Sequence, residues 1–395
     1  MKTYSLTQVT LTLSSLFLAW SLMESRAADD AALKQVFKGH FLVGAALNQS
    51  QFTGSNAAEV AIIDKHFDTT TPENALKWEA VNPKLGKFDF GRADQYVDFG
   101  EKHGMFIIGH NLVWHNQTPK WVFEDDKGEA LTRDALLARM REHIATVVGR
   151  YKGRIKGWDV VNEALNEDGA LRQSKWRKII GDDYLVKAYQ FAHEADPDAE
   201  LYYNDFSIEN APKRAGAIRL VKDLQAHGVK IAAVGVQGHY DLLWPSTNLL
   251  DEALTDLSKL GVKLMITELD VNVLRGGTRG EVADLRRSRS RRNPYPDGLP
   301  AEMQQKLADR YADIFKIFLK HAEIQRITFW GVTDGDSWLN WPGVTNYPLL
   351  FGRDFQPKPA FDAVVKAATE FGNEVVTAPV GLGAKWDRHG QPGRR

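Results

Sequence analysis

Short apolar runs alternate with longer, helix-like stretches along most of this chain. Eight of the runs are rich in Val, Ile, Phe and Tyr, and they cover residues 41–47, 67–74, 105–114, 155–163, 199–206, 232–240, 263–271 and 324–332. The stretches between them, such as residues 132–151 and 300–321, place apolar residues at i, i+3, i+4 and i+7, which is the spacing of an amphipathic helix. Regular alternation of strands and helices predicts a parallel sheet.

Eight strands that are each followed by a helix predict a single α/β domain, a (β/α)8 TIM barrel over residues 28–370. A doubly wound open sheet is the alternative. The ends of the runs favour the barrel, because almost every run begins apolar and ends in Asn, Glu, His, Asp or Trp. In a parallel barrel the carboxyl ends of all strands meet at one rim, so we expect these residues to line one pocket.

Both ends of the chain depart from this alternation. Residues 1–27 carry an early lysine, an apolar stretch, and Ser25 and Ala27 in the spacing of a cleavage site, which predicts a secretory signal peptide and a mature protein outside the cytoplasm, extracellular or periplasmic. An uncleaved membrane anchor is the alternative. Residues 371–395 are expected to form a disordered tail, since apolar periodicity stops near Thr377.

Composition narrows the possible partners. The chain has 395 residues and a formal net charge of −1, so we expect neither nucleic acid nor an anionic membrane as a partner. There is no cysteine, which excludes disulfides, thiolate nucleophiles and cysteine-ligated metals. The 11 Trp and 11 Tyr suit the faces of sugars as well as a core. We expect a monomer that uses no cofactor.

One segment, residues 275–296, carries seven arginines among Gly and Pro and is expected to be a loop after the seventh strand. A solvated surface loop is the favoured interpretation. The alternative is a clamp for an acidic side group on a substrate.

Two glutamates stand at strand ends in the same way. A single glutamate such as Glu163, at the end of one run, is more often a structural partner in an ion pair than a catalyst. Glu268, however, closes the run at residues 263–271 in the same manner. Two acids at one barrel rim form the pair that glycoside cleavage requires, one to protonate the leaving oxygen and one to attack or to activate water.

Hydrogen-bonding and aromatic residues accompany these acids at the other strand ends. They are Glu73, Asn74, Lys77, His110, Trp114, His115, Gln117, Gln237, His239, Trp330 and Trp338. Ligands rich in uncharged hydroxyls need many donors and acceptors and flat apolar walls, so this set fits a carbohydrate better than a phosphate.

A metal site is the rival interpretation of the same residues. His110, His115, His239, Glu268 and Asp270 carry the necessary ligand atoms. The sequence has no His-x-His on the first strand and no helical HExxH, and His110 and His115 are far apart on an extended strand. We therefore expect no catalytic metal.

Seven motifs together resemble the family 10 glycoside hydrolases, which are secreted endo-1,4-β-xylanases with a (β/α)8 barrel. The resemblance runs from about Phe37 to Val365 and rests on TPEN, GHNLVWH, WDVVNEAL, YYND, GVQGH, ITELDV and WGVTDGDSWL. It implies xylan and xylo-oligosaccharides as partners and internal β-1,4-xylosidic bonds as the target. Related barrel enzymes acting on β-glucan, and a barrel that binds sugar without cleaving it, are the alternatives.

The resemblance also implies roles for individual residues. Glu163 would be the acid/base and Glu268 the nucleophile, with anomeric configuration retained and the two carboxyl groups about 5 to 5.5 Å apart. Asn162 would hold the sugar 2-hydroxyl, and His239, oriented by Asp270, would hydrogen-bond Glu268. The residues implied to bind hydroxyls on the non-reducing side are Glu73, Asn74, Lys77, His110 and Gln237, with Gln117 nearby. Trp114, Trp330 and Trp338 would form the walls of the cleft, and Tyr203 and Asn204 would form a platform on the leaving-group side.

Overall fold

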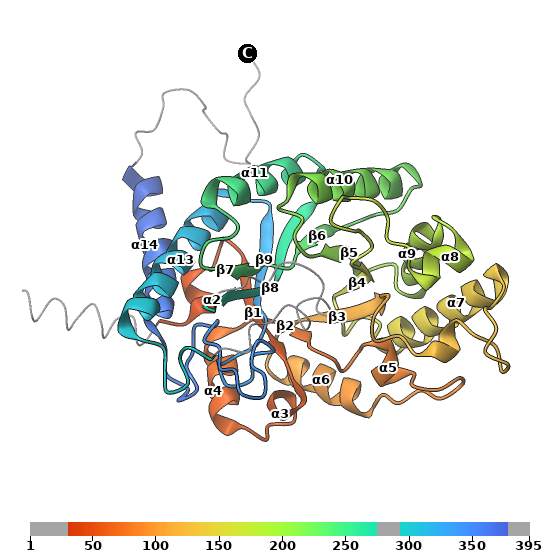
Figure 1. Cartoon of the computed structure of the whole chain (residues 1–395), viewed down its shortest axis with the longest axis horizontal. Coiled ribbons are helices and arrows are strands. Elements are labelled where there is room, and N and C mark those ends of the chain that lie inside the picture. Colours follow the sequence, from red (N-terminus) through yellow and green to blue (C-terminus); the bar gives the residue numbers. More distant parts are fainter. Residues whose placement is uncertain (1–30, 275–292, 378–395) are drawn as a thin grey trace, which may run out of the picture.

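Eight parallel strands in sequence order close into a barrel in the computed structural model, which describes residues 31–274 and 293–377. The strands are β1 (Leu42–Leu47), β2 (Thr69–Pro72), β3 (Phe106–Val113), β4 (Gly157–Asn162), β5 (Glu200–Asp205), β6 (Ala233–Val236), β8 (Lys263–Asn272) and β9 (Ile324–Phe329). Pairing of β6 with β8 and of β1 with β9 completes the circle (Figure 1). The predicted barrel is therefore confirmed, and the open-sheet alternative is wrong.

The sixth predicted strand, residues 232–240, is broken in two. Gly238 takes the left-handed value φ +80°, a conformation that glycine adopts without steric cost. After this kink a short strand, β7 (His239–Asp241), leaves the line of β6 and pairs with the end of β8, with His239 opposite Asp270. Because of this break, His239 lies at the barrel rim beside the end of β8.

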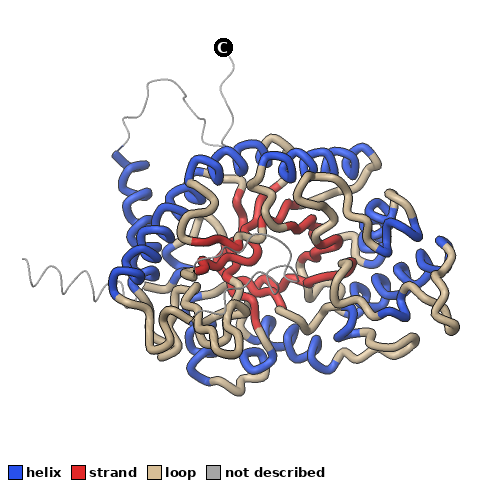
Figure 2. Tube along the Cα trace, viewed as in Figure 1, coloured by secondary structure: helices blue, strands red, loops and turns tan. Residues whose placement is uncertain are grey.

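Helices form an outer layer around the strands (Figure 2). They are α2 (Leu33–Val36), α3 (Gln49–Phe52), α4 (Ala57–His66), α5 (Trp78–Val81), α6 (Gly91–Lys102), η1 (Lys120–Val122), α7 (Arg133–Arg150), α8 (Lys175–Ile180), α9 (Tyr184–Ala195), α10 (Ala211–Ala226), α11 (Thr247–Ser258), α13 (Ala301–Lys320) and α14 (Pro359–Thr377). The helices predicted at residues 132–151 and 300–321 are α7 and α13, each shorter by one residue at either end.

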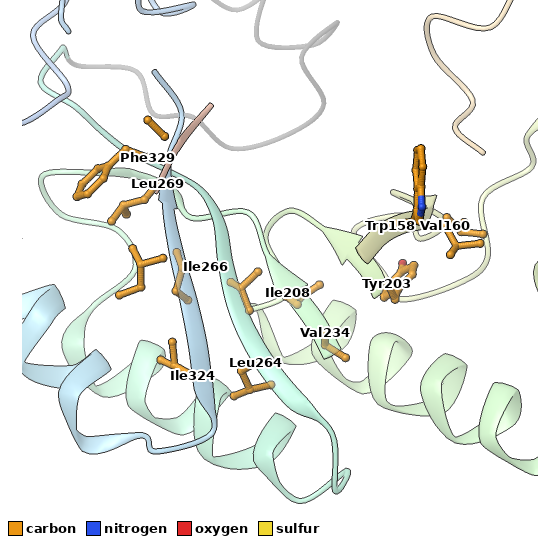
Figure 3. Packing of buried hydrophobic residues seen from close by; sticks show 14 of the residues in the cluster. Trp158, Val160, Tyr203, Ile208, Val234, Leu264, Ile266, Leu269, Ile324 and Phe329 are labelled. Atoms are coloured by element: carbon orange, nitrogen blue, oxygen red, sulfur yellow. The ribbon is translucent and has the colours of Figure 1, made fainter. Parts of the chain in front are cut away.

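Most of the core lies between the barrel and these helices. Strand residues of this layer include Tyr203, Val234, Leu264, Ile266 and Phe329 (Figure 3). A second, smaller cluster joins β3, β5, β6 and β8 inside the barrel and consists of Ile108, Tyr202, Ala233 and Met265. Because side chains alternate along a strand, neighbouring residues of one strand belong to different layers.

Close approach of β1 and β2 makes Gly44 a sensitive position. A Cβ atom at Gly44 would lie 2.3 Å from the backbone oxygen of Thr69, whereas one at Gly149 in α7 would meet nothing within 4 Å. We expect Gly44→Ala to lower the free energy of unfolding by about 1–3 kcal/mol and Gly149→Ala to raise it by about 0.5–1 kcal/mol. Urea unfolding curves measure both, and similar losses in the two variants would contradict this packing.

The chain ends bear on the predicted domain limits. Helix α14 continues to Thr377, so residue 371 is too early a boundary for the predicted C-terminal tail. The predicted signal peptide, residues 1–27, and most of the arginine-rich segment, residues 275–292, lie outside the described residues. Within the described ranges, no helix has both the length and the apolar character that crossing a bilayer requires.

Candidate active site

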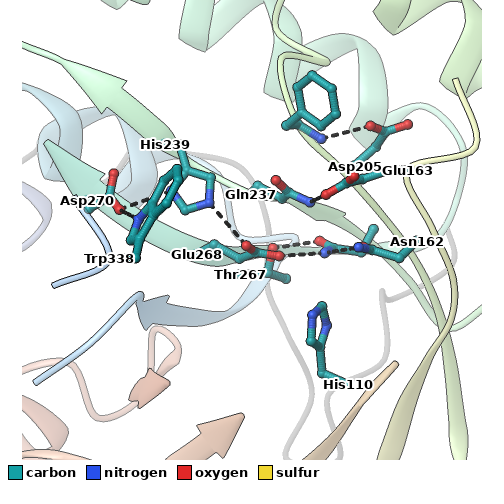
Figure 4. Close-up of polar contacts among 12 residues, drawn as sticks. His110, Asn162, Glu163, Asp205, Gln237, His239, Thr267, Glu268, Asp270 and Trp338 are labelled. Carbon is teal, nitrogen blue, oxygen red and sulfur yellow. Dashed lines mark hydrogen bonds and ion pairs between the residues drawn. The ribbon is translucent and has the colours of Figure 1, made fainter. Parts of the chain in front are cut away.

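The two predicted acids meet at the carboxyl ends of the barrel strands. Glu163 directly follows β4, and Glu268 lies in β8; their side chains are directed toward a common space (Figure 4). Only 4% of Glu163 and 5% of Glu268 is exposed. The structure therefore brings together two buried carboxyl groups that are 105 residues apart in sequence.

Glu163 is fixed through both its side chain and its backbone. Trp114 Nε1 donates to Oε2 at 2.8 Å, and Gln237 Nε2 donates to Oε1 at 2.9 Å. The backbone has φ +56°, which is uncommon for a residue with a side chain. This conformation is held by the Glu163 N–H, which donates to the Asn204 carbonyl at 2.9 Å, and by Arg172 Nε, which donates to the Glu163 carbonyl at 3.1 Å.

Burial raises the pKa of the Glu163 carboxyl above its ordinary value. The charges of Asp205 and Glu268 act in the same direction, while His115 and the Gln237 hydrogen bond oppose them. The neutral, proton-carrying form of Glu163 is therefore favoured.

Glu268 has the opposite tendency in an equally buried place. Burial alone would raise its pKa, but hydrogen bonds from His239 and Asn204 and the charges of His239 and His110 hold the pKa below the ordinary value. His239 Nε2 lies 3.0 Å from Oε2, and Asn204 Nδ2 donates to Oε1 at 2.8 Å. The ionised form of Glu268 is therefore favoured.

His239 carries the charge that stabilises this carboxylate. Burial would lower its pKa, but the charge of Asp270 and hydrogen bonds to Asp270 and Glu268 raise it to about 10. Its Nδ1 lies 3.0 Å from Asp270 Oδ2, an oxygen that also accepts from Trp338 Nε1 at 2.6 Å. The Trp338 ring lies 4.8 Å from the His239 ring. Trp338 therefore orients this chain of contacts, a connection that the sequence alone did not predict.

Asn204 connects β4 and β8, the strands that position the two acids, through side-chain hydrogen bonds. Its Nδ2 donates to Asn162 Oδ1 at 2.8 Å as well as to Glu268, and its Oδ1 accepts from Thr267 Oγ1 at 2.6 Å. The leaving-side platform predicted from Tyr203 and Asn204 is wrong. Tyr203 points from β5 into the layer beneath the helices and is fully buried, and Asn204 is fully buried as well, so neither offers a face to a ligand.

A lysine-centred cluster lies beside the acids. Lys77 Nζ donates to Asn74 Oδ1 at 3.0 Å and to Gln117 Oε1 at 2.8 Å, and it lies 5.0 Å from the centroid of the Trp114 ring. Glu73 is half-buried, and loss of water contact raises its pKa to about 7, with Lys77 opposing the rise. Glu73, Asn74, Lys77 and Gln117 thus gather, with many donors and acceptors in one place, whereas His110 and Gln237 contact Asp159 and Glu163 instead.

His110 is held by Asp159, a residue that the sequence did not single out. Its Nδ1 lies 2.8 Å from Asp159 Oδ2, and the two residues are register partners in β3 and β4. The ring of Trp330 lies 5.6 Å from His110 and 6.2 Å from His239, so it lies beside both imidazoles. An aspartate within the apolar run of β4 was the available signal for Asp159.

The side chains at the rim are engaged with each other rather than gathered as ligands. Among residues 31–274 and 293–377, no three His, Asp or Glu side chains are arranged to hold a metal ion. The nitrogens Nδ1 of His110 and of His239 already contact carboxylates.

Fold and site together define the class of protein. The rim of the (β/α)8 barrel holds two carboxyl groups, one with a raised and one with a lowered pKa, in contact with amide, imidazole and indole groups. This is the apparatus of a barrel glycoside hydrolase. The model of glycosyl hydrolase family 10 matches residues 32–367. The chain belongs to this family.

Individual relatives agree with this placement. The chain is 43% identical to an endo-1,4-β-xylanase A of Xylanibacter ruminicola, over 86% of this chain and 94% of the relative. It is 40% identical to a β-1,4-xylanase of Dictyoglomus thermophilum, over 92% and 98%. Among solved structures, a GH10 endoxylanase from a sugarcane soil metagenome aligns with a TM-score of 0.80 at 43% identity, covering 85% of this chain and 99% of that one.

Proposed function

We propose that this enzyme is an endo-acting xylanase that cleaves internal β-1,4-xylosidic bonds with retention, using Glu163 as acid/base and Glu268 as nucleophile. Membership of glycosyl hydrolase family 10 and relatives named as xylanases support the reaction and the substrate. The observation that carries the two roles is the opposite direction of the pKa shifts of two facing, buried carboxyl groups. Environments that separate two pKa values in this way distinguish an acid from an anion.

The first step divides the work between the two acids. Glu268 attacks the anomeric carbon as a carboxylate, and Glu163 gives its proton to the leaving glycosidic oxygen. The leaving sugar departs as a neutral alcohol, and the glycosyl group remains as an ester of Glu268. His239 holds the attacking oxygen by the contact at 3.0 Å between Nε2 and Oε2.

The second step reverses these roles. Forming the ester removes the negative charge of Glu268, which was one cause of the raised pKa of Glu163. Glu163 then takes a proton from water, which attacks the anomeric carbon and releases Glu268. Two inversions at one carbon give net retention.

The neighbouring side chains are assigned to the substrate. Asn162, held by Asn204 at 2.8 Å, contacts the sugar 2-hydroxyl. The cluster of Glu73, Asn74, Lys77 and Gln117 binds hydroxyls on the non-reducing side together with His110 and Gln237. The indole rings of Trp114, Trp330 and Trp338 form the apolar walls of the cleft.

The pH dependence of cleavage is expected to reflect the two acids. With an unactivated xylo-oligosaccharide, kcat/KM should fall on the acid side as Glu268 gains a proton, and on the alkaline side as Glu163, whose pKa is raised, loses its proton. Rates measured from about pH 4 to about pH 10 should give a bell-shaped profile. With dinitrophenyl β-xylobioside, whose leaving group needs no proton, the alkaline fall should be much weaker. The same alkaline fall on both substrates would contradict the role of Glu163.

Substrate class is tested by comparing initial rates on xylan and on β-glucan under identical conditions. A pentose polymer lacks the hydroxymethyl group of a hexose polymer, and Trp338, packed against His239 at 4.8 Å, is the candidate wall that leaves no room for this group. We expect xylan to be cleaved at least about tenfold faster, the scale of one extra or missing carbon group in a tight pocket. A preference for β-glucan would remove the xylanase proposal.

We also propose that the enzyme is exported. The support is the lysine, apolar stretch and small residues within residues 1–27. Sequencing the amino terminus of enzyme recovered outside the producing cells tests this, with cleavage after about residue 27 as the expected result. An intact amino terminus on protein found only in the cytoplasm would contradict it.

A further inference from the structure

A buried ion pair lies behind Glu163, and no step of the mechanism above uses it. Lys213 Nζ lies 3.0 Å from Asp205 Oδ1, and both side chains have no exposed surface. The same Asp205 oxygen accepts from the Phe206 N–H at 2.9 Å, and the Tyr203 hydroxyl donates to Oδ2. Lys213 Nζ also lies 3.2 Å from the centroid of the Phe206 ring. Both charges are thus held in fixed positions away from water.

The pair is next to Glu163 by strand register. Asn162 at the end of β4 is the partner of Asn204 in β5, and the Glu163 N–H donates to the Asn204 carbonyl. Asp205 is the following residue of β5, and its charge is one of those that act on the Glu163 carboxyl (Figure 4).

Helix α10, which carries Lys213, is pressed against the loop that follows Glu163. A Cβ atom at Gly216 would lie 2.4 Å from the Gly169 oxygen, so helix and loop touch backbone to backbone. This contact brings the lysine over Asp205. Burying an ion pair costs desolvation that its attraction often fails to repay, so stability alone is a poor explanation for the arrangement.

We propose that Asp205 and Lys213 are positioning residues that balance the charge beside Glu163 and so set the pH at which cleavage is lost in alkaline solution. This inference rests on the proposed role of Glu163 as the acid. Charges buried side by side are little screened by salt, so their balance acts strongly on a neighbouring carboxyl group. The Asp205 carboxylate favours a proton on Glu163, and the Lys213 ammonium offsets this effect. In agreement, the charge of Asp205 is among the causes, after burial, that raise the pKa of Glu163.

Other charged groups also act on Glu163 or contact its backbone. They are Glu268 in β8, His115 in the loop after β3, Lys77 ahead of α5 and Arg172 in the loop after β4. Lys213 in turn lies 3.5 Å from Glu167. None of these groups is changed by substitutions at Asp205 or Lys213. A shift in the pH at which cleavage is lost in alkaline solution can therefore be assigned to the Asp205–Lys213 pair.

The test measures the alkaline limit, which is the pH on the alkaline side at which kcat/KM on xylotetraose has fallen to half of its maximum. It compares this limit in Asp205→Asn, Lys213→Met and the double variant. Asp205→Asn removes the negative charge and should lower the alkaline limit by about one pH unit. Lys213→Met leaves Asp205 unbalanced and should raise the limit, and the double variant should lie between the two. Asparagine keeps the shape of Asp205, Lys213 retains Glu167 as a partner, and the double variant buries no lone charge, so folded protein is available for comparison.

Controls separate this inference from general damage and from the role of Glu163. Arg214, the next residue of α10, is a buried cation whose ion-pair partners, Glu252 at 2.6 Å and Asp256 at 3.1 Å, belong to α11. Arg214→Met should leave the alkaline limit unchanged. Equal limits in all variants, with only the rate reduced, or the reverse order of limits, would overturn the inference.

Glu163→Gln distinguishes the two possible failures. If its residual cleavage of xylotetraose still shows the wild-type alkaline limit, Glu163 is not the group that titrates and the proposed role itself fails. If that limit disappears in Glu163→Gln but does not move in the Asp205 and Lys213 variants, the role of Glu163 stands and only the inference about the ion pair is wrong.

Discussion

Glu268→Ala is expected to lower kcat on the order of 10⁵-fold on every glycoside, activated or not. The loss is general because no substrate can supply the missing nucleophile, however good its leaving group. His239 would keep its contact with Asp270 at 3.0 Å, so the surroundings of the vacated space should persist. Rates on xylan and on dinitrophenyl β-xylobioside should therefore fall together.

Two further variants sharpen this test. Glu268→Gln keeps the size of the side chain and removes the charge, so it separates loss of the nucleophile from the effect of a void. Glu209 is a buried glutamate in the loop after β5, 1% exposed, and Glu209→Gln should keep most of the activity. Substantial residual turnover of the aryl substrate by Glu268→Ala would contradict the assignment.

Glu163→Ala should have a selective effect that depends on the leaving group. On xylan, where the leaving alcohol must be protonated, kcat/KM should fall by about 10²- to 10⁴-fold. On dinitrophenyl β-xylobioside the first step needs no acid, so a burst of dinitrophenolate should precede a slow steady state in which the glycosyl-enzyme waits for a base. Stopped-flow absorbance measures burst and steady state separately.

Azide offers a positive check on the same variant. A small anion needs no general base, so it should accelerate the slow second step of Glu163→Ala and give a glycosyl azide of retained configuration. In Glu268→Ala the anion would have to enter from the side of the missing nucleophile, giving the inverted product. Equal losses on xylan and on the aryl substrate, with no rescue by azide, would contradict the acid/base role of Glu163.

The sequence was sufficient for the barrel and for the two acids. Alternation of apolar runs with amphipathic stretches is a property of local periodicity, and a glutamate at the end of an apolar strand marks the rim wherever the strand lies in the barrel. Glu163 and Glu268 could therefore be placed together before any distance was known.

Features that depend on register and on side-chain direction could not be obtained in this way. Tyr203 was placed at the cleft, although it belongs to the opposite face of β5 from Asn204. The contact of Asp159 with His110 depends on pairing between β3 and β4. The Asp205–Lys213 pair depends on how closely α10 packs on a loop. Such contacts follow from packing between distant segments, which local periodicity does not encode.

The most direct measurement of the central claim is mass spectrometry of the enzyme after reaction with an activated 2-deoxy-2-fluoro-xylobioside. Fluorine at this position disfavours positive charge at the anomeric carbon and slows the second step, so the covalent intermediate should accumulate. We expect one fluoroxylobiosyl group per enzyme, attached to the peptide that contains Glu268. Attachment to Glu163 or to another residue, or rapid turnover with inversion and no adduct, would contradict the account.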